Sequence, residues 1–223
     1  GTGWGAGLWG AGTWGSVSPI ADSSQLRLWS QDNFGDDLIA NIRGGGIYYW
    51  DESSGATQRA IPFTSLTNAS NPPILALQIM VSDIDRHIIC FGANAIGEST
   101  VDPLFVRWSD QESSIDWTPT STNTAGGTRL SSGSTIIGAL KTRQEILIWT
   151  DSGVHSMQYS GAPFIFSFAE IMQGPSMISP KAAINADNKV FFMDRGSFYV
   201  YTGSVQTLPC AVQDYIFSDI NLG

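Results

Sequence analysis

Four short runs of the chain look like versions of one β-hairpin, and this self-similarity limits the folds that the chain can adopt. In each run, β-branched or aromatic residues precede a Trp or Met, and an Asp and a turn follow. The large residues are Trp50, Trp108, Trp149 and Met193, at intervals of 58, 41 and 44 residues. Repetition at such a period is typical of the blades of a β-propeller or a related array. The uneven intervals indicate insertions between the repeats.

The remaining segments carry strand and turn patterns and no long helical period. Strands are predicted at residues 26–29, 38–42, 47–50, 88–91, 104–108, 136–140, 145–149, 154–159, 164–168, 189–193 and 197–201. Residues 32–36 have turn chemistry, and residues 52–73 and 119–135 predict long surface loops. Residues 74–81 fit a strand or a short helix, and residues 215–222 fit a strand or an exit to further sequence. We therefore expect an all-β fold, a β-propeller-like array of small antiparallel sheets with almost no helix.

The chain divides into two parts by composition. Its 223 residues are 42% hydrophobic, which is enough for a substantial core. We expect residues 1–25 to be a Gly/Trp-rich extended segment and residues 26–223 to be a β-propeller-like domain. Because the chain begins with Gly1 rather than Met, we expect it to be a fragment and its propeller to be incomplete.

Six of the eight tryptophans are candidates for packing and interfaces rather than for chemistry. Trp4, Trp9 and Trp14 recur every five residues, a period that fits neither a helix nor a strand, and glycines around them disfavour a helix. We expect an extended strap whose indoles enter crevices of the propeller or of a neighbouring subunit; a disordered terminus is the alternative.

Three further tryptophans lie in the repeated runs. Trp50, Trp108 and Trp149 are candidates for packing between blades, because regularly spaced aromatic side chains in a propeller usually fill the space between sheets. The same spacing also fits a sugar-binding face.

The charge of the chain argues against tight binding to nucleic acid. Twenty acidic and 11 basic side chains give a net charge of −9. Proteins that hold phosphates need clustered Lys and Arg. A surface past which nucleic acid slides without being held remains compatible with this charge.

No motif for a cofactor, a metal or catalysis stands out. Two G-x-G-x-x-G matches, at residues 5–10 and 10–15, lack the preceding strand and following helix of a dinucleotide site. His87 and His155 are the only histidines and lack metal-ligand spacing. The turn carboxylates fit side-chain bonds to the backbone, although they could include a glycosidase pair. We expect no enzyme activity, no metal and no cofactor.

Two further sequence features concern the cellular environment. Cys90 and Cys210 lie in apolar surroundings, which favours buried thiols over a disulfide between them. The sequence contains no run of 18 apolar residues and no signal peptide, so we expect no membrane span.

Several strings of the sequence resemble a family of bacteriophage proteins. They are residues 26–41, 44–51, 178–183 and 208–221, and the likeness runs along most of residues 3–221. The family is that of the tail nozzle, tail tubular or packaged-DNA stabilisation proteins of short-tailed phages. The resemblance implies a propeller-containing subunit of a ring below the portal and adaptor, which closes the DNA exit channel and opens on infection. It transfers no individual functional residue.

The expected function is therefore that of a structural virion protein in the phage tail, assembled in the host cytoplasm. Its expected partners are identical subunits in a ring, adaptor or portal-side tail proteins, tail fibres, and DNA that passes without tight binding. Such a tube subunit needs extensive lateral contacts and an acidic inner face. The alternatives are a receptor- or glycan-binding propeller of a tail fibre, and a glycoside hydrolase fragment.

Overall fold

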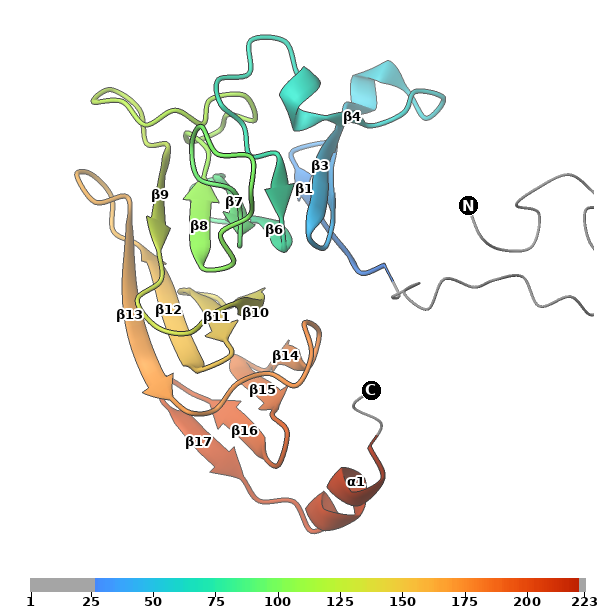
Figure 1. The fold of residues 1–223 in the computed structure, drawn as a ribbon, viewed down its shortest axis with the longest axis vertical. Helices are drawn as coiled ribbons and strands as arrows, with labels where there is room; N and C mark the ends of the chain where they lie inside the picture. Colours follow the sequence, from blue (N-terminus) through green and yellow to red (C-terminus); the bar gives the residue numbers. More distant parts are fainter. Residues whose placement is uncertain (1–26, 221–223) are drawn as a thin grey trace, which may run out of the picture.

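The computed structural model describes residues 27–220, which form four antiparallel sheets (Figure 1). The first sheet contains β1 (Trp29–Phe34), β2 (Asp37–Ile42), β3 (Gly45–Trp50) and β4 (Ile61–Pro62), and β5 (Leu75–Ala76) pairs with the start of β3. The second contains β6 (Gln78–Val81), β7 (Ile88–Phe91), β8 (Phe105–Trp108) and β9 (Gly126–Arg129). The third contains β10 (Ile136–Lys141), β11 (Ile146–Thr150), β12 (Gly153–Tyr159) and β13 (Phe166–Gln173). The fourth contains β14 (Ala183–Ala186), β15 (Lys189–Met193), β16 (Phe198–Tyr201) and β17 (Val205–Leu208).

Within residues 27–220 the helical elements are short. They are the 3-10 turns η1 (Glu52–Ser54) and η2 (Phe63–Ser65) and the α-helix α1 (Gln213–Asp219). The expected all-β fold, a propeller-like array of small antiparallel sheets, is confirmed. No helix of the described residues is long and apolar enough to cross a membrane.

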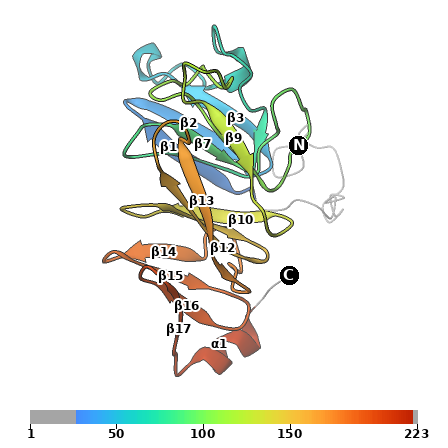
Figure 2. The same cartoon turned by 90° about the vertical axis from the view of Figure 1, so that its left-hand side faces the viewer.

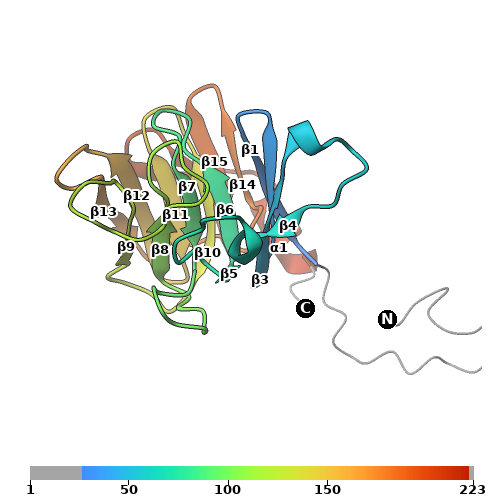
Figure 3. The ribbon, with the colours of Figure 1, turned by 90° about the horizontal axis from the view of Figure 1, so that it is seen from above.

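The four sheets are stacked in chain order. Figure 2 shows the first and second sheets together at the top, the third below them, and the fourth with α1 at the bottom; in Figure 3, seen from above, the first sheet lies to the right of the second and third. In each sheet the strands follow one another as a meander. The first strands β1 and β6 contact each other, as do β10 and β14. We call β1, β6, β10 and β14 the inner strands.

Apolar side chains fill the three layers between consecutive sheets. The layer between the first and second sheets holds Ile39, Ile47, Phe63, Ile79, Ile88 and Trp117 among others. The next layer holds Ile89, Phe91, Val106, Trp108, Ile148 and Phe166, and the last holds Leu147, Trp149, Val154, Val190 and Phe192. Strands β7 and β11 are buried along their whole length, because their sheets have a neighbour on each face.

Most predicted hairpins are confirmed. The predicted runs 38–42 and 47–50 are β2 and β3, joined by a turn at Arg43 and Gly44, whose φ of 69° suits glycine. The predicted meander at 136–159 is β10 to β12, and the runs 189–193 and 197–201 pair as β15 and β16. Residues 74–81, left as strand or short helix, form the strands β5 and β6.

Four sequence predictions were wrong in detail. Of the strand predicted at 26–29, residues 27 and 28 precede β1, which begins at Trp29. The turn predicted at 32–36 is confined to Gly35 and Asp36, because Asp32 belongs to β1 and bonds to the next sheet. The loop predicted at 119–135 contains β9, in which a Cβ on Gly126 would lie 2.6 Å from Cζ2 of Trp108. Glycine is thus needed there for close packing within a strand. Residues 215–219, for which a strand was one of the two predictions, belong to α1.

The four similar runs do not occupy equivalent places. Trp50 and Trp108 lie on β3 and β8, the third strands of their sheets, whereas Trp149 and Met193 lie on β11 and β15, the second strands. Second and third strands both have a partner on each side and an apolar layer to fill. They therefore acquire the same sequence pattern without sharing a position in a repeat.

Candidate functional site

A groove runs along the inner strands and has both polar and apolar side chains in its lining. It is lined by β1, β6, β10, the start of β14 and nearby connecting residues, and it has a volume of about 730 Å³. The inner strands of different sheets do not form backbone ladders with one another. Side chains therefore make the connections between the sheets. We call this region the inner groove.

The connection from β1 to β6 uses alternate residues of both strands. The backbone N–H of Ile79 donates to Ser30 Oγ at 3.0 Å, and that of Val81 donates to Asp32 Oδ2 at 2.9 Å. Because side chains alternate between the two faces of a strand, Ser30 and Asp32 point the same way. Two hydrogen bonds thus replace two rungs of a backbone ladder.

Lys141, at the end of β10, joins three segments at the inner groove. Its Nζ lies 2.9 Å from Asp32 Oδ2 and 2.8 Å from Asp83 Oδ1, and it donates to the carbonyl oxygen of Val81 at 3.1 Å. Burial alone would lower the pKa of Lys141, but the hydrogen bonds and charges of Asp83 and Asp32 outweigh it and raise the pKa. All three protons of the ammonium group have a partner.

Gln78 connects β6 to β10 through both ends of its amide. Its Nε2 donates to the carbonyl oxygen of Ala139 at 2.7 Å, and the N–H of Ala139 donates to Gln78 Oε1 at 2.8 Å. The Gln78 side chain thus satisfies the donor and the acceptor that β10 presents at its unpaired edge.

Two further side chains tie the inner strands to each other. Arg43 donates from Nη2 to the carbonyl oxygen of Ile136 at 3.1 Å, and burial lowers the pKa of its guanidinium. Asn185 of β14 donates to the carbonyl oxygen of Lys141 at 3.3 Å. The inner groove therefore fixes all four sheets relative to one another.

The inner groove carries charges of both signs. Its charged lining residues are Asp32, Arg43, Lys141 and Lys181. Lys141 is neutralised by the carboxylates of Asp32 and Asp83, and Arg43 is bonded to carbonyl oxygens. Asp32, Arg43 and Lys141 therefore serve contacts inside the chain, and the acidic excess of the chain lies outside the inner groove.

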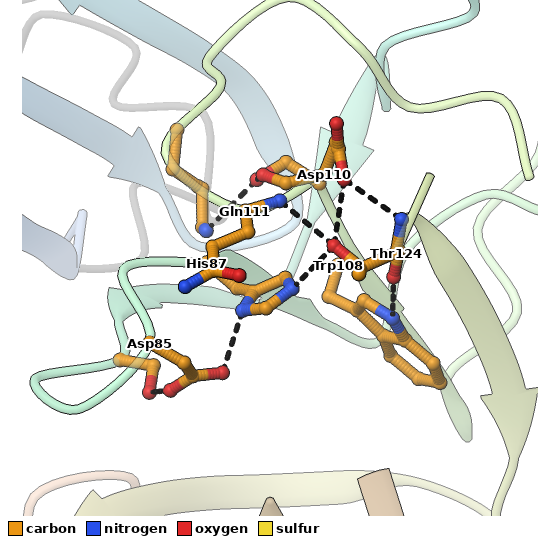
Figure 4. Close-up of polar contacts among 9 residues, drawn as sticks. Asp85, His87, Trp108, Asp110, Gln111 and Thr124 are labelled. Carbon is orange, nitrogen blue, oxygen red and sulfur yellow. Dashed lines mark hydrogen bonds and ion pairs between the residues drawn. The ribbon is translucent and has the colours of Figure 1, made fainter. Parts of the chain in front are cut away.

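A second polar cluster, on the second sheet, superficially resembles a catalytic triad (Figure 4). Asp85 Oδ2 lies 2.5 Å from His87 Nδ1, and His87 Nε2 lies 2.9 Å from Thr124 Oγ1. Thr124 Oγ1 also donates to Asp110 Oδ1 at 2.6 Å and accepts from the N–H of Gln111 at 2.9 Å. Trp108 Nε1 donates to the carbonyl oxygen of Thr124 at 2.9 Å.

The bonding of Thr124 argues against a nucleophile. A hydroxyl has one proton and two lone pairs, and here the proton goes to Asp110, so that His87 must donate instead of accepting. A general base has to accept the proton of its nucleophile. His87 is also fully buried, at 0% exposure. The cluster therefore anchors β9 and the loop before it to β7 and β8.

His155 forms a similar arrangement on the third sheet. Ser132 Oγ lies 3.1 Å from His155 Nε2 and donates to Glu170 Oε1 at 2.7 Å. Burial lowers the pKa of His155, although the Glu170 carboxylate opposes this effect. Both histidines thus hold a hydroxyl whose proton is directed to a carboxylate.

The tryptophans predicted as packing residues occupy different environments. Trp149 is fully buried, with its ring centroid 5.4 Å from that of Phe192 across the third layer. Trp108 is 5.1 Å from Phe166, between the second and third sheets. Trp50 is half-buried and donates to the carbonyl oxygen of Gln58. Trp4, Trp9 and Trp14 lie outside the described residues.

The sequence prediction missed one buried charged residue. Arg107 is 1% exposed and donates to the carbonyl oxygens of Asn94, Asn71 and Trp117. Burial lowers the pKa of its guanidinium. The only sequence signal for this role was an Arg within a run of apolar residues, because an Arg that is fully buried is almost always paired. Arg107 holds together loops that lie far apart in the sequence.

The two cysteines are free, and the described residues contain no cluster of metal-binding side chains. Cys90 and Cys210 are free, so the alternative of a disulfide between them was wrong. Cys90 is buried, and burial raises the pKa of its thiol to about 12. Across residues 27–220 no group of three or more His, Cys, Asp or Glu is placed to hold a metal ion.

Comparisons with known proteins add little to this description. No family model and no curated protein matches the chain. Among solved structures, the chain is similar to Hsv2 of Kluyvelomyces marxianus, with a TM-score of 0.42 and 6% identity. The match covers 80% of this chain and 49% of the other, so the chain spans about half the length of that structure. No partner and no activity follow from this likeness.

Proposed function

We propose that this chain is a structural subunit of a phage tail nozzle, in which copies form a ring around the channel through which DNA leaves the particle. The proposal includes adaptor or portal-side tail proteins and tail fibres as partners, and no catalysis. The chain would act in the tail of the virion, after assembly in the host cytoplasm.

The sequence resemblance of residues 26–41, 44–51, 178–183 and 208–221 carries the assignment to this family. The observation that supports a structural role is that the polar side chains of the inner groove and of the Thr124 cluster bond within the chain. In the inner groove, Lys141, Gln78 and Asp32 all bond within the chain, and Thr124 is equally committed in its own cluster. Polar groups whose hydrogen-bonding capacity is already used within the chain stabilise a rigid scaffold, and they are poorly suited to bind a substrate.

The charge of the chain supports passage of DNA without capture. A ring that repeats a subunit of net charge −9 would repel phosphates over distances comparable with the Debye length, about 8 Å at physiological salt. Two of the three cations of the inner groove, Lys141 and Arg43, already have partners and would not counteract this repulsion.

Electron microscopy of purified virions that contain the chain tests the proposal. An antibody against the exposed η1 region, around Glu52–Ser54, should label the tail tip, and averaged images should show a closed ring at the labelled position. Label on fibres alone or on the capsid would contradict the proposal.

One observation favours the alternative of a glycan-binding protein. Tyr159 is 41% exposed beside a recess of about 200 Å³, which Asp83 and Arg143 also line. An exposed ring with polar groups nearby is what a sugar needs. The chain would be tested for binding to the polysaccharide that the virion uses as a receptor. Loss of this binding in Tyr159→Ala would favour the alternative, and unchanged binding would count against it.

A further inference from the structure

The inner groove offers apolar surface to an occupant. Its polar side chains Asp32, Gln78 and Lys141 already bond within the chain. Its lining also contains apolar side chains that remain solvent-accessible, namely Leu28, Trp29, Leu77, Leu140 and Ala183. Trp29 is the most exposed of them, at 46%. Because burial of apolar surface drives association, this lining selects an occupant that is apolar and carries little charge.

A second recess adjoins the inner groove at the point where the chain enters the first sheet. It has a volume of about 820 Å³ and shares Leu28, Leu77 and Pro180 with the lining of the inner groove. Arg27, the first residue of the described part of the chain, also lines this recess. Residues 1–26 are therefore joined covalently to the wall of the groove.

The composition of residues 1–26 matches the apolar lining of the groove. Asp22 is the only charged residue among them, whereas three are Trp and four are Leu, Val or Ile. A Trp side chain buries about 150–250 Å² when it is enclosed. Seven of the 26 residues are Gly, which allows a backbone to approach another surface closely.

The charges of the two parts are complementary. Lys181 is an exposed cation in the lining of the inner groove, and none of the ion pairs within residues 27–220 includes it. Asp22 has the opposite charge and precedes Arg27 by five positions. The one charge of residues 1–26 therefore favours their approach to the groove.

Residues 1–26 are long enough to cover the inner groove. Trp14 precedes Arg27 by 13 positions. An extended chain advances about 3.3 Å per residue, so Trp14 can reach any point within about 40 Å of Arg27. Packed sheets are about 10 Å apart, so the four inner strands extend over about 30 Å. A tethered segment also has an effective concentration on the order of 1 mM, which favours it over a free partner or a second copy.

We propose that the segment before Arg27 lies along the inner groove of the same copy, with the indole of Trp14 against the apolar lining. The segment acts as a strap across the four inner strands. It adds apolar burial to the side-chain bonds that already connect the sheets. The inference goes beyond the proposed function, because it requires neither a ring nor a phage tail.

Photo-crosslinking in the full chain locates the segment. Trp14 is replaced by the photoreactive amino acid p-benzoyl-phenylalanine, and a dilute solution is irradiated and digested for mass spectrometry. Crosslinks should join position 14 to peptides that contain Leu77 or Leu140, from the second and third sheets. A mixture of isotopically labelled and unlabelled chains should show that they form within one copy. The same amino acid in place of Phe164, which is 77% exposed between β12 and β13, is the matched control and should not reach the groove.

Three substitutions test whether the groove holds the segment. Trp29→Glu places a charge on the apolar lining and should lower the crosslink yield at least about tenfold. Ile184→Glu, at a position on β14 that is 62% exposed and outside this lining, should leave the yield unchanged. Circular dichroism verifies the fold of both variants. Trp14→Ala leaves residues 27–220 unaltered and should lower the melting temperature by at least about 3 °C.

Three results would overturn the inference. They are crosslinks from position 14 that lie outside the groove or form mainly between copies, a crosslink yield that survives Trp29→Glu, and a melting temperature that Trp14→Ala leaves unchanged. Crosslinks between copies would show that the groove receives the segment of a neighbour instead. If Trp29→Glu does not fold, the crosslink map and Trp14→Ala still decide. A misplaced antibody label on the virion would not affect any of these results, so the inference and the proposed function can fail separately.

Discussion

Lys141 and Asp32 form an ion pair of 2.9 Å although they are 109 positions apart in the sequence. Asp32 belongs to the first sheet and Lys141 to the third, and Asp32 Oδ2 also accepts the N–H of Val81 from the second. One carboxylate oxygen thus touches three sheets. No single layer of apolar side chains connects the first sheet with the third, so this contact and the bond from Arg43 to Ile136 set their relative orientation.

We predict that Lys141→Met destabilises the chain by about 1–3 kcal/mol, because it leaves Asp32 and the carbonyl oxygen of Val81 without their donor. A double-mutant cycle with Asp32→Asn, followed by urea unfolding, measures the coupling. We expect the two changes to be strongly non-additive, as for residues in one network. Additive effects would show that the pair does not join the sheets.

The amide of Gln78 gives a second prediction. Gln78→Leu should lower the free energy of unfolding by about 1–3 kcal/mol, because the N–H and carbonyl of Ala139 then lose their partners in a buried position. Gln144→Leu, in an exposed turn, is the control and should change stability by less than about 0.5 kcal/mol. Equal effects of both variants in chemical denaturation would contradict this account.

The Thr124 cluster allows a prediction that separates the contribution of the Thr124 hydroxyl to stability from that of its methyl group. Thr124→Val should cost about 2–3 kcal/mol, since Asp110 loses a donor while the N–H of Gln111 and Nε2 of His87 lose an acceptor. Thr124→Ser keeps the hydroxyl and should cost clearly less. If thermal unfolding shows that Ser is as damaging as Val, the methyl group rather than the hydroxyl stabilises this region.

The pKa of His155 predicts a pH dependence of stability. Its pKa in the folded chain is lowered from 6.5 by burial, so the unfolded chain binds more protons below that pH. Stability should therefore fall as the pH decreases from about 6.5 towards the lowered pKa. His155→Asn should show a smaller loss of melting temperature between about pH 7 and pH 5. Identical pH profiles would mean that His155 is not the titrating group.

The net charge predicts the behaviour towards DNA. At about 0.15 M salt we expect no measurable binding of duplex DNA in a mobility-shift or fluorescence-anisotropy assay, because phosphates are repelled by a chain of charge −9. Lys181, an exposed cation of the inner groove, should not change this result when it is replaced by Gln. Tight binding with a steep salt dependence would reveal a basic surface and contradict the proposed passage of DNA.

The sequence by itself determined the local structure of this protein. Alternating apolar residues at 38–42 and 47–50, with glycines between them, specify a hairpin wherever it packs. The same reasoning located the strands from 136 to 159, because strand period and turn chemistry are properties of neighbouring residues.

The tertiary structure alone decided how the strands are combined. Gly126 and Gly127 look like loop residues until Trp108 and Phe105 are seen to occupy the space above them. The similar runs around Trp50 and Trp149 lie on the third strand of the first sheet and on the second strand of the third sheet, respectively. Both kinds of strand need the same apolar pattern. The pairing of Asp32 with Lys141 could not be predicted for the same reason: a sequence pattern records which face of a strand is buried, but not which distant segment lies against it.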